Sequence, residues 1–249
     1  MGVAGLPMAQ TPVKPRPKVQ NPNESPVNPM PPVVVALFFL IVGIEALFSL
    51  GAAGILGGAQ ALGWRIGALQ DYGFSGEIFQ WMWANNRWPS EHVMRFVTYG
   101  FVHGSFTHAL FVSVMLLAMG KFVGQVLSQL ATLVLFVAGL VAGAVAHGAM
   151  HGLLGWGSPW LVGGFPGVYA LIGGFTYLIW VRLVATGSSG ARAFGLIGAL
   201  MAIRLVFGLL FGSYGTWLAD LVGFGIGFGL SVLLVPGGLA RLRQRLRRD

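Results

Sequence analysis

The sequence predicts an all-α polytopic membrane protein, a six-transmembrane helical bundle with an interfacial helical first loop. Three observations predict this fold class. Of the 249 residues 55% are hydrophobic and only 9% are charged, whereas soluble domains carry about 25% charged residues. Six apolar segments follow a polar leader, and each can cross a hydrocarbon core of about 30 Å. Tryptophans gather in the longest polar connection, as is typical of a membrane–water interface.

The leader, residues 1–32, holds nine of the 13 prolines and few apolar clusters. This composition predicts a disordered, proline-rich cytoplasmic segment. It is not typical of a signal peptide, because the first long apolar run starts only after Pro32 and no small-residue cleavage site follows it.

The membrane domain is predicted over residues 33–236 and is followed by a basic cytoplasmic tail, 237–249. The expected helices lie at 33–52, 104–120, 126–149, 166–185, 193–212 and 217–236. Small residues recur at a spacing of four, which lets helix backbones approach closely in lipid. The pairs are Gly139 and Gly143, Ala170 and Gly174, and Gly223 and Gly227.

Basic residues give the expected orientation. They are Lys14, Arg16 and Lys18 in the leader, Lys121 after the second helix, Arg182 and Arg192 after the fourth, and five arginines in the tail. Because basic residues favour the cytoplasm, both termini are expected inside, in a multi-pass protein of a bacterial inner (plasma) membrane. The net charge of +8 therefore predicts contact with the lipid bilayer and no nucleic acid. The absence of cysteine excludes disulfides and thiol chemistry.

The first loop carries the stretch EIFQWMWANNRW, which sets Phe79, Trp81, Trp83 and Trp88 among polar residues. Tryptophan favours the membrane boundary. Residues 64–95 are therefore expected to form interfacial helices on the outer face.

The stretch MRFVTYGFVHGSFTHALF, residues 94–111, resembles the start of the rhomboid intramembrane serine protease core. The matching residues are Arg95, Thr98, Tyr99, Phe101, His103, Gly104, Ser105 and His108, and Gly120 matches further on, while Met94 replaces the family tryptophan. The run VGGFPGVYALIGGF resembles the Gly-x-Ser-Gly helix, and ADLVGFGIG resembles the last core helix. Three motifs in order imply the rhomboid fold over roughly 33–236.

The family chemistry is not matched. The resemblance puts Pro166 at the nucleophile position, Asp220 at the base position, and His108 and Val112 at the oxyanion positions. Proline has no hydroxyl, and valine cannot donate to an oxyanion. We therefore expect no catalytic residues here and interpret Gly163–Pro166 as a helix start, where proline is favoured.

The other polar residues are assigned structural or binding roles. The candidate binding-cavity residues are His103, His108, Gly167, Tyr169 and Asp220. Asp220 is expected to join the fourth and sixth helices near the amides of Gly167 and Val168. Arg95 is expected to anchor the first loop. Glu45 and Arg204 are either functional or a buried ion pair with each other or with Asp220.

The leading functional hypothesis is a rhomboid pseudoprotease that binds transmembrane client proteins in assembly or quality control. One alternative is a rhomboid-type endopeptidase with a diverged active site, using Ser158 or Ser213 with His151 or His108. A second is an ion or solute transporter with Glu45, Arg204, Asp220 and the histidines along its route. No cofactor is expected, and no metal, because His147 and His151 share a helical face without an acidic third ligand nearby.

Overall fold

The computed structural model describes residues 29–155, 158–211, 216–235 and 238, with only the backbone path at 204, 205 and 207–211. The expected leader, apart from its last residues, and almost all of the expected tail lie outside the described residues. The elements are α1 Pro32–Ala52, η1 Gly58–Gly63, α2 Trp64–Tyr72, β1 Phe74–Ser75, α3 Gly76–Asn85, α4 Ser90–Val93, α5 Arg95–Thr98, η2 Tyr99–Phe101, α6 Phe106–Gly124, α7 Gln129–Leu154, β2 Trp160–Leu161, α8 Phe165–Ala185, η3 Gly190–Phe194, α9 Gly195–Phe211 and α10 Trp217–Leu234.

Within the described residues, five helices are long and apolar enough to cross a membrane: α1, α6, α7, α8 and α10. Their lengths run from 18 to 26 residues, close to the roughly 20 that a bilayer core requires. The sixth expected segment is α9, which is apolar and has 17 residues. The chain is thus a multi-pass helical protein, and the count of six spans stays a prediction.

Three helices, α7, α8 and α10, pack closely together, and glycines make the approach possible. A Cβ on Gly143 would lie 2.7 Å from the Cβ of Pro166, and one on Gly139 would lie 2.6 Å from the Pro166 carbonyl oxygen. A Cβ on Gly223 would lie 3.0 Å from the Pro166 carbonyl carbon. The small-residue spacing therefore marks the backbone contacts between these helices.

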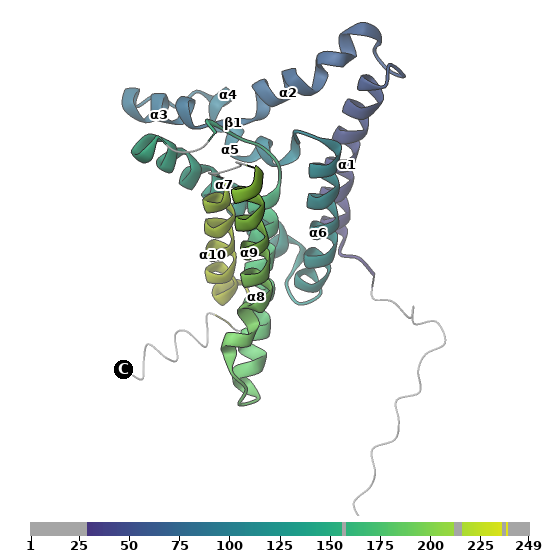
Figure 1. Cartoon of the computed structure of the whole chain (residues 1–249). Helices are drawn as coiled ribbons and strands as arrows, with labels where there is room; N and C mark the ends of the chain where they lie inside the picture. Colours follow the sequence, from purple (N-terminus) through teal and green to yellow (C-terminus); the bar gives the residue numbers. More distant parts are fainter. Residues whose placement is uncertain (1–28, 156–157, 212–215, 236–237, 239–249) are drawn as a thin grey trace, which may run out of the picture.

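The pair α1 and α6 lies beside this group, side by side in Figure 1. A Cβ on Gly120 would lie 2.7 Å from a methyl group of Val34, so the contact needs a glycine on α6. The start of α1 is held as well, because Val33 N donates to the Gln129 side-chain oxygen at 2.9 Å, at the start of α7.

The helices α2, α3 and α4 lie across one end of the bundle (Figure 1). On α3, Phe79 and Met82 are buried, while Trp81 and Trp83 are exposed. Trp88, which follows α3, is exposed too. This amphipathic arrangement fits the expected interfacial position, because the tryptophans point away from the core.

One feature departs from an all-helical fold. Phe74 and Ser75 pair as an antiparallel strand with Leu161 and Trp160. The bonding continues at Gly76, whose amide donates to the Pro159 carbonyl at 2.6 Å. The hydrophobic pattern could not predict a two-residue pairing between segments that are 86 residues apart. Its effect is to join the first loop to the segment that enters α8.

Arg95 holds the first loop from the other side. Its Nη1 donates to the carbonyl oxygens of Gln70 at 2.7 Å and Gly73 at 3.1 Å. The Thr98 hydroxyl donates to the Tyr72 carbonyl at 3.0 Å. The end of α2 is therefore tied to α5, which is the anchoring role that the sequence analysis expects of Arg95.

Candidate functional site

The start of α8 depends on two glycines. Gly163 has φ of 91°, a left-handed conformation that favours glycine, and its amide donates to the Tyr99 carbonyl at 2.8 Å. A Cβ there would also lie 2.5 Å from His108 Nε2. Gly164 is the N-cap, and Pro166 sits in the first turn, where its missing amide hydrogen has no helical partner to lose.

Phe165 and Pro166 point in different directions from this helix start. The Phe165 ring stacks on the His108 imidazole, with centroids 5.2 Å apart and 22° between the planes. Pro166 is buried against the glycines of α7 and α10 instead. The residue beside the histidines is therefore Phe165 rather than Pro166, the residue that the resemblance assigns to the nucleophile position. Neither side chain carries a hydroxyl.

His103 and His108 form a pair, with ring centroids 5.0 Å apart and planes at 84°. His103 is 1% exposed, and its Nε2 accepts a hydrogen bond from the Gly164 amide at 3.3 Å. Burial, and next the neighbouring His108, lower the pKa of His103 from 6.5 to about 3. His103 is thus neutral at ordinary pH and serves as an acceptor that caps the start of α8.

Val112 lies on α6 directly below this point. It is fully buried, and one of its methyl groups would lie 3.0 Å from a Cβ on Gly164. Val112 is apolar and supplies no hydrogen-bond donor where the family resemblance implies one, whereas His108, also on α6, stacks on Phe165.

Asp220 lies in the first turn of α10 and is 1% exposed. It shares a helical face with Gly223, which packs on the Pro166 backbone, so this face turns toward the start of α8. Its charge acts on Tyr99, whose pKa is raised well above 10, by burial first and by Asp220 second. The Tyr99 hydroxyl donates to the Leu140 carbonyl at 2.8 Å.

The expected contact of Asp220 with the amides of Gly167 and Val168 stays a prediction. The Val168 amide donates to the Gly164 carbonyl at 3.0 Å within α8. A Cβ on Gly167 would lie 2.7 Å from the Phe136 ring of α7. The Val168 amide therefore bonds within α8, and the Cα of Gly167 packs against α7.

The candidate cavity residues are mostly packed in the core. His103, Gly167, Tyr169 and Asp220 are all buried. His108 and Phe165 are the half-buried members of the group, so they form its accessible rim. Tyr169 extends the aromatic contact, with its ring 6.3 Å from that of Phe165.

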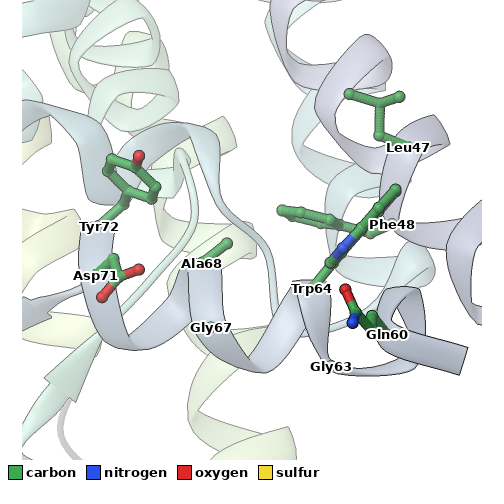
Figure 2. Close-up of a pocket in the computed structure, with 9 residues that line it drawn as sticks. All are labelled: Leu47, Phe48, Gln60, Gly63, Trp64, Gly67, Ala68, Asp71 and Tyr72. Atoms are coloured by element: carbon green, nitrogen blue, oxygen red, sulfur yellow. The ribbon is translucent and has the colours of Figure 1, made fainter. Parts of the chain in front are cut away.

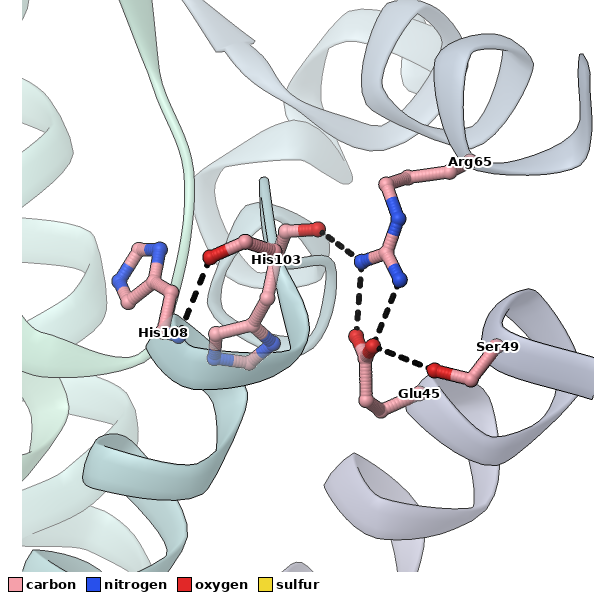
Figure 3. Close-up of polar contacts among 6 residues, drawn as sticks. Glu45, Ser49, Arg65, His103 and His108 are labelled. Carbon is pink, nitrogen blue, oxygen red and sulfur yellow. Dashed lines mark hydrogen bonds and ion pairs between the residues drawn. The ribbon is translucent and has the colours of Figure 1, made fainter. Parts of the chain in front are cut away.

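Glu45 and its partner form the second polar cluster (Figure 3). Arg65 Nη2 and Nη1 donate to the two Glu45 carboxylate oxygens at 2.6 and 2.8 Å. Nη1 also donates to the His103 carbonyl at 2.9 Å, and the Ser49 hydroxyl donates to Glu45 at 3.0 Å. This cluster, the Glu45–Arg65 clamp, connects α1, α2 and the segment that carries His103.

The Glu45–Arg65 clamp changes the expected partner of Glu45 and adds Arg65 to the polar residues of interest. The sequence left open a functional role for Glu45 and Arg204 or a buried ion pair with each other or with Asp220. The partner of Glu45 is Arg65, because Glu45 lies near the end of α1 where the chain turns back into α2. The signal for Arg65 was available, since it is the first cation after an acidic residue near a helix end. Arg204 falls within α9, and its side chain is outside the described part of the protein.

The remaining polar candidates lie apart from this group. His147 is buried and its ring is 6.3 Å from that of Phe74, while His151 packs against Gly76. Ser158 is exposed and its hydroxyl oxygen accepts from the Trp160 amide at 3.1 Å. Ser213 lies outside the described residues. Among the described residues, His, Asp and Glu side chains form no group of three that could hold a metal ion.

The fold and a comparison with known protein families define the class to which this protein belongs. The helical bundle, its glycine contacts and the helix start beside a histidine pair belong to a multi-pass membrane protein of the intramembrane protease-like kind. The family model described as "Rhomboid domain" matches residues 90–237, well over half of the chain. The chain belongs to the rhomboid family. No curated protein matches it.

Proposed function

We propose that this protein is a rhomboid pseudoprotease that binds transmembrane segments of client membrane proteins. One observation carries the proposal: the side chain set beside the histidines at the start of α8 is Phe165, stacked on His108. No serine, threonine or cysteine occurs between Trp160 and Phe175. Acyl transfer by a side chain requires a nucleophile within reach of a base, and this helix start offers none.

The residues at the base and oxyanion positions, Asp220 and Val112, support the same proposal. Asp220 could accept a proton, but no hydroxyl at this helix start is present for it to activate. Val112 is buried and apolar at the position expected to stabilise an oxyanion. Removing one such donor from a working acyl-transfer site costs about 2.7–4 kcal/mol. A site with no nucleophile at the helix start, no histidine at position 220 and no donor at position 112 is better suited to binding than to hydrolysis.

The surface next to the rim is suited to an apolar helix. Phe106, Leu110 and Val114 recur every four residues on α6, and each is about half exposed or more. Such a stripe is one exposed face of α6. We propose that a client helix packs along this face.

We extend the proposal to location. Lys121 lies in the last turn of α6 and Arg182 in the last turn of α8, at the end of the bundle opposite α2 (Figure 1). Because basic residues favour the cytoplasm, this end is proposed to face inside, with both termini cytoplasmic in a bacterial plasma membrane. The proposed leader, membrane domain and tail keep the boundaries 1–32, 33–236 and 237–249.

The alternatives have less support. A relocated protease site would need a serine near a histidine, and Ser158 has its hydroxyl oxygen bonded to the Trp160 amide. A transport route would need accessible charges, but Glu45 is 4% exposed and clamped by Arg65. A route past Asp220 on α10 would also need open space between the helices, and a packed core that includes Val112 and Phe136 lies there.

The test is a cleavage assay with purified full-length protein in liposomes that contain a fluorescent transmembrane substrate. Asp220→Ala is the matched variant. We expect no cleavage in either protein, no labelling by a serine-directed phosphonate, and capture of client helices by a photo-crosslinker at Phe106. Cleavage that Asp220→Ala abolishes would overturn the proposal. Labelling lost in Ser158→Ala or Ser213→Ala would support the relocated protease instead.

A further inference from the structure

A groove of about 700 Å³ lies between the end of α1 and the helix α2, away from the start of α8. It is lined by Leu47, Phe48, Gln60, Gly63, Trp64, Gly67, Ala68, Asp71 and Tyr72. Figure 2 shows Asp71 and Tyr72 at one end, with Leu47 and Phe48 at the other. The volume is that of a site for a small molecule, and the lining is mostly apolar and aromatic.

Asp71 gives the groove its charge. None of the nine lining residues is cationic. Two arginines lie beside the lining and are bonded elsewhere. Arg65 is 5.4 Å from the centroid of the Phe48 ring and donates to Glu45 and the His103 carbonyl. Arg95 donates to the Gln70 and Gly73 carbonyls. Among the lining side chains the charged one is Asp71, so an ammonium group would meet a carboxylate and the neighbouring ring of Tyr72.

The groove is continuous with the exposed face of α1. Leu40 and Leu47 are seven residues apart on that helix and about half exposed. Gly43 lies between them on the same face, with nothing within 4 Å of the position that a Cβ would take. Leu40, Gly43 and Leu47 together form an apolar track along the surface of α1, and this track leads to the groove.

The position of α2 favours a lipid over a protein helix as the molecule that occupies the track and the groove. The helix α2 lies across the end of α1 (Figure 1), so the track ends at the groove. A membrane-spanning helix would have to continue past this point. A phospholipid ends there, because its headgroup lies at the level where α1 leaves the apolar region and where Trp64 is exposed.

We propose that the groove is a binding site for a phospholipid with an ammonium headgroup, whose acyl chain follows Leu47 and Gly43. The ammonium lies at Asp71, beside the ring of Tyr72. The site is independent of the proposed client binding, since it uses none of the residues at the start of α8.

The test is a lipid titration of the full chain in detergent micelles, followed by native mass spectrometry. The lipids are phosphatidylethanolamine, phosphatidylcholine and phosphatidylglycerol with identical acyl chains. We expect the two ammonium lipids to bind about two- to fivefold more tightly than phosphatidylglycerol, the range of an exposed ion pair. Ethanolamine above choline would indicate hydrogen bonding to Asp71, and equal binding would indicate ring contacts.

Two pairs of variants test whether the lipids bind in this groove and whether Asp71 sets the headgroup preference. Asp71→Asn should remove the preference for ammonium lipids, while Glu91→Gln, a charge change in α4 away from the groove, should keep it. Gly67→Leu fills the groove without a clash, because nothing lies within 4 Å of its Cβ position, and should weaken binding of all three lipids. Gly229→Leu, equally open but on α10, should not. The same preference in Asp71→Asn as in wild type, or unchanged binding in Gly67→Leu, would overturn the proposal.

Discussion

The ring of Phe165 is stacked on the imidazole of His108, at 5.2 Å between centroids and 22° between planes. The next residue, Pro166, faces the glycines of α7 and α10. Two adjacent residues thus divide the two functions of this helix start. Phe165 covers the histidine rim, and Pro166 allows three helices to pack at backbone distance. A serine in place of Phe165 would leave the packing of Pro166 against α7 and α10 in place.

This division predicts where a nucleophile can be rebuilt. We expect Phe165→Ser combined with Asp220→His to be labelled by a serine-directed phosphonate, because residue 165 faces the accessible side. Pro166→Ser with Asp220→His should stay unlabelled, since residue 166 is enclosed by Gly143 and Gly223. Adding Val112→Asn to the first pair should raise the labelling rate by about 10²–10³, the effect of one oxyanion donor.

The measurement is gel-based labelling of the purified variants, with wild type as the control. Labelling confined to the Pro166→Ser variant would show that residue 166, and not residue 165, faces the accessible side. Equal labelling of wild type would show a different nucleophile elsewhere in the chain.

The glycine contacts of α10 give a second prediction. We expect Gly223→Ala to destabilise the protein by about 1–3 kcal/mol, because its Cβ would push against the Pro166 backbone. Gly225→Ala is the matched control two residues away, with nothing within 4 Å of the added Cβ. It should be neutral or stabilising by up to about 1 kcal/mol, since alanine favours the helix.

Unfolding of the two variants in mixed micelles, followed by circular dichroism, measures the difference. A smaller loss in Gly223→Ala than in Gly225→Ala would contradict the packing of α10 on α8.

The main features of the fold could be predicted because apolar length and glycine spacing are properties of single helices. The expected helix at 166–185 differs by one residue from Phe165–Ala185. The spacing of Gly139 and Gly143 also located a real contact, since small residues four apart lie on one helical face.

The site could be predicted only in part, because its details depend on rotation and on distant partners. A helical rotation of about 100° per residue separates the directions of Phe165 and Pro166, and the resemblance alone could not fix which one meets His108. The pairing of Glu45 with Arg65 depends on the path of the chain between α1 and α2. The strand contact of Phe74 with Leu161 is too short to leave a pattern.

The Glu45–Arg65 clamp gives a third prediction. Arg65→Ala leaves the Glu45 carboxylate, 4% exposed, without its cation. Breaking a fully buried pair costs about 3–5 kcal/mol, and this pair is partly accessible through Arg65, so we expect a loss of about 2–3 kcal/mol. Arg65→Ala with Glu45→Gln should recover part of that loss, because the uncompensated charge is gone.

A double-mutant cycle on reversible unfolding measures the coupling of the two residues. Arg65→Lys is the conservative control, and it should be intermediate, because an ammonium cannot bond both carboxylate oxygens and the His103 carbonyl in the same planar geometry. Additive effects of the two single substitutions would show that the clamp does not contribute as a pair.

The buried histidine gives a fourth prediction, on pH. The pKa of His103 is lowered from 6.5 to about 3, chiefly by burial, so the unfolded chain binds a proton that the folded protein does not over this interval. Stability should therefore be constant with respect to His103 above pH 6.5 and fall as pH decreases toward 3. The slope from this one group is at most about 1.4 kcal/mol per pH unit.

His103→Gln should flatten this dependence, because glutamine can still accept from the Gly164 amide but does not titrate. His92→Gln, a change in α4 that leaves His103 in place, is the matched control and should keep the slope. Free energies of unfolding measured between pH 4 and 8 in the same micelles compare the three proteins. A slope that survives in His103→Gln would mean that another group, with a folded-state pKa below its unfolded value, takes up the proton as the protein unfolds.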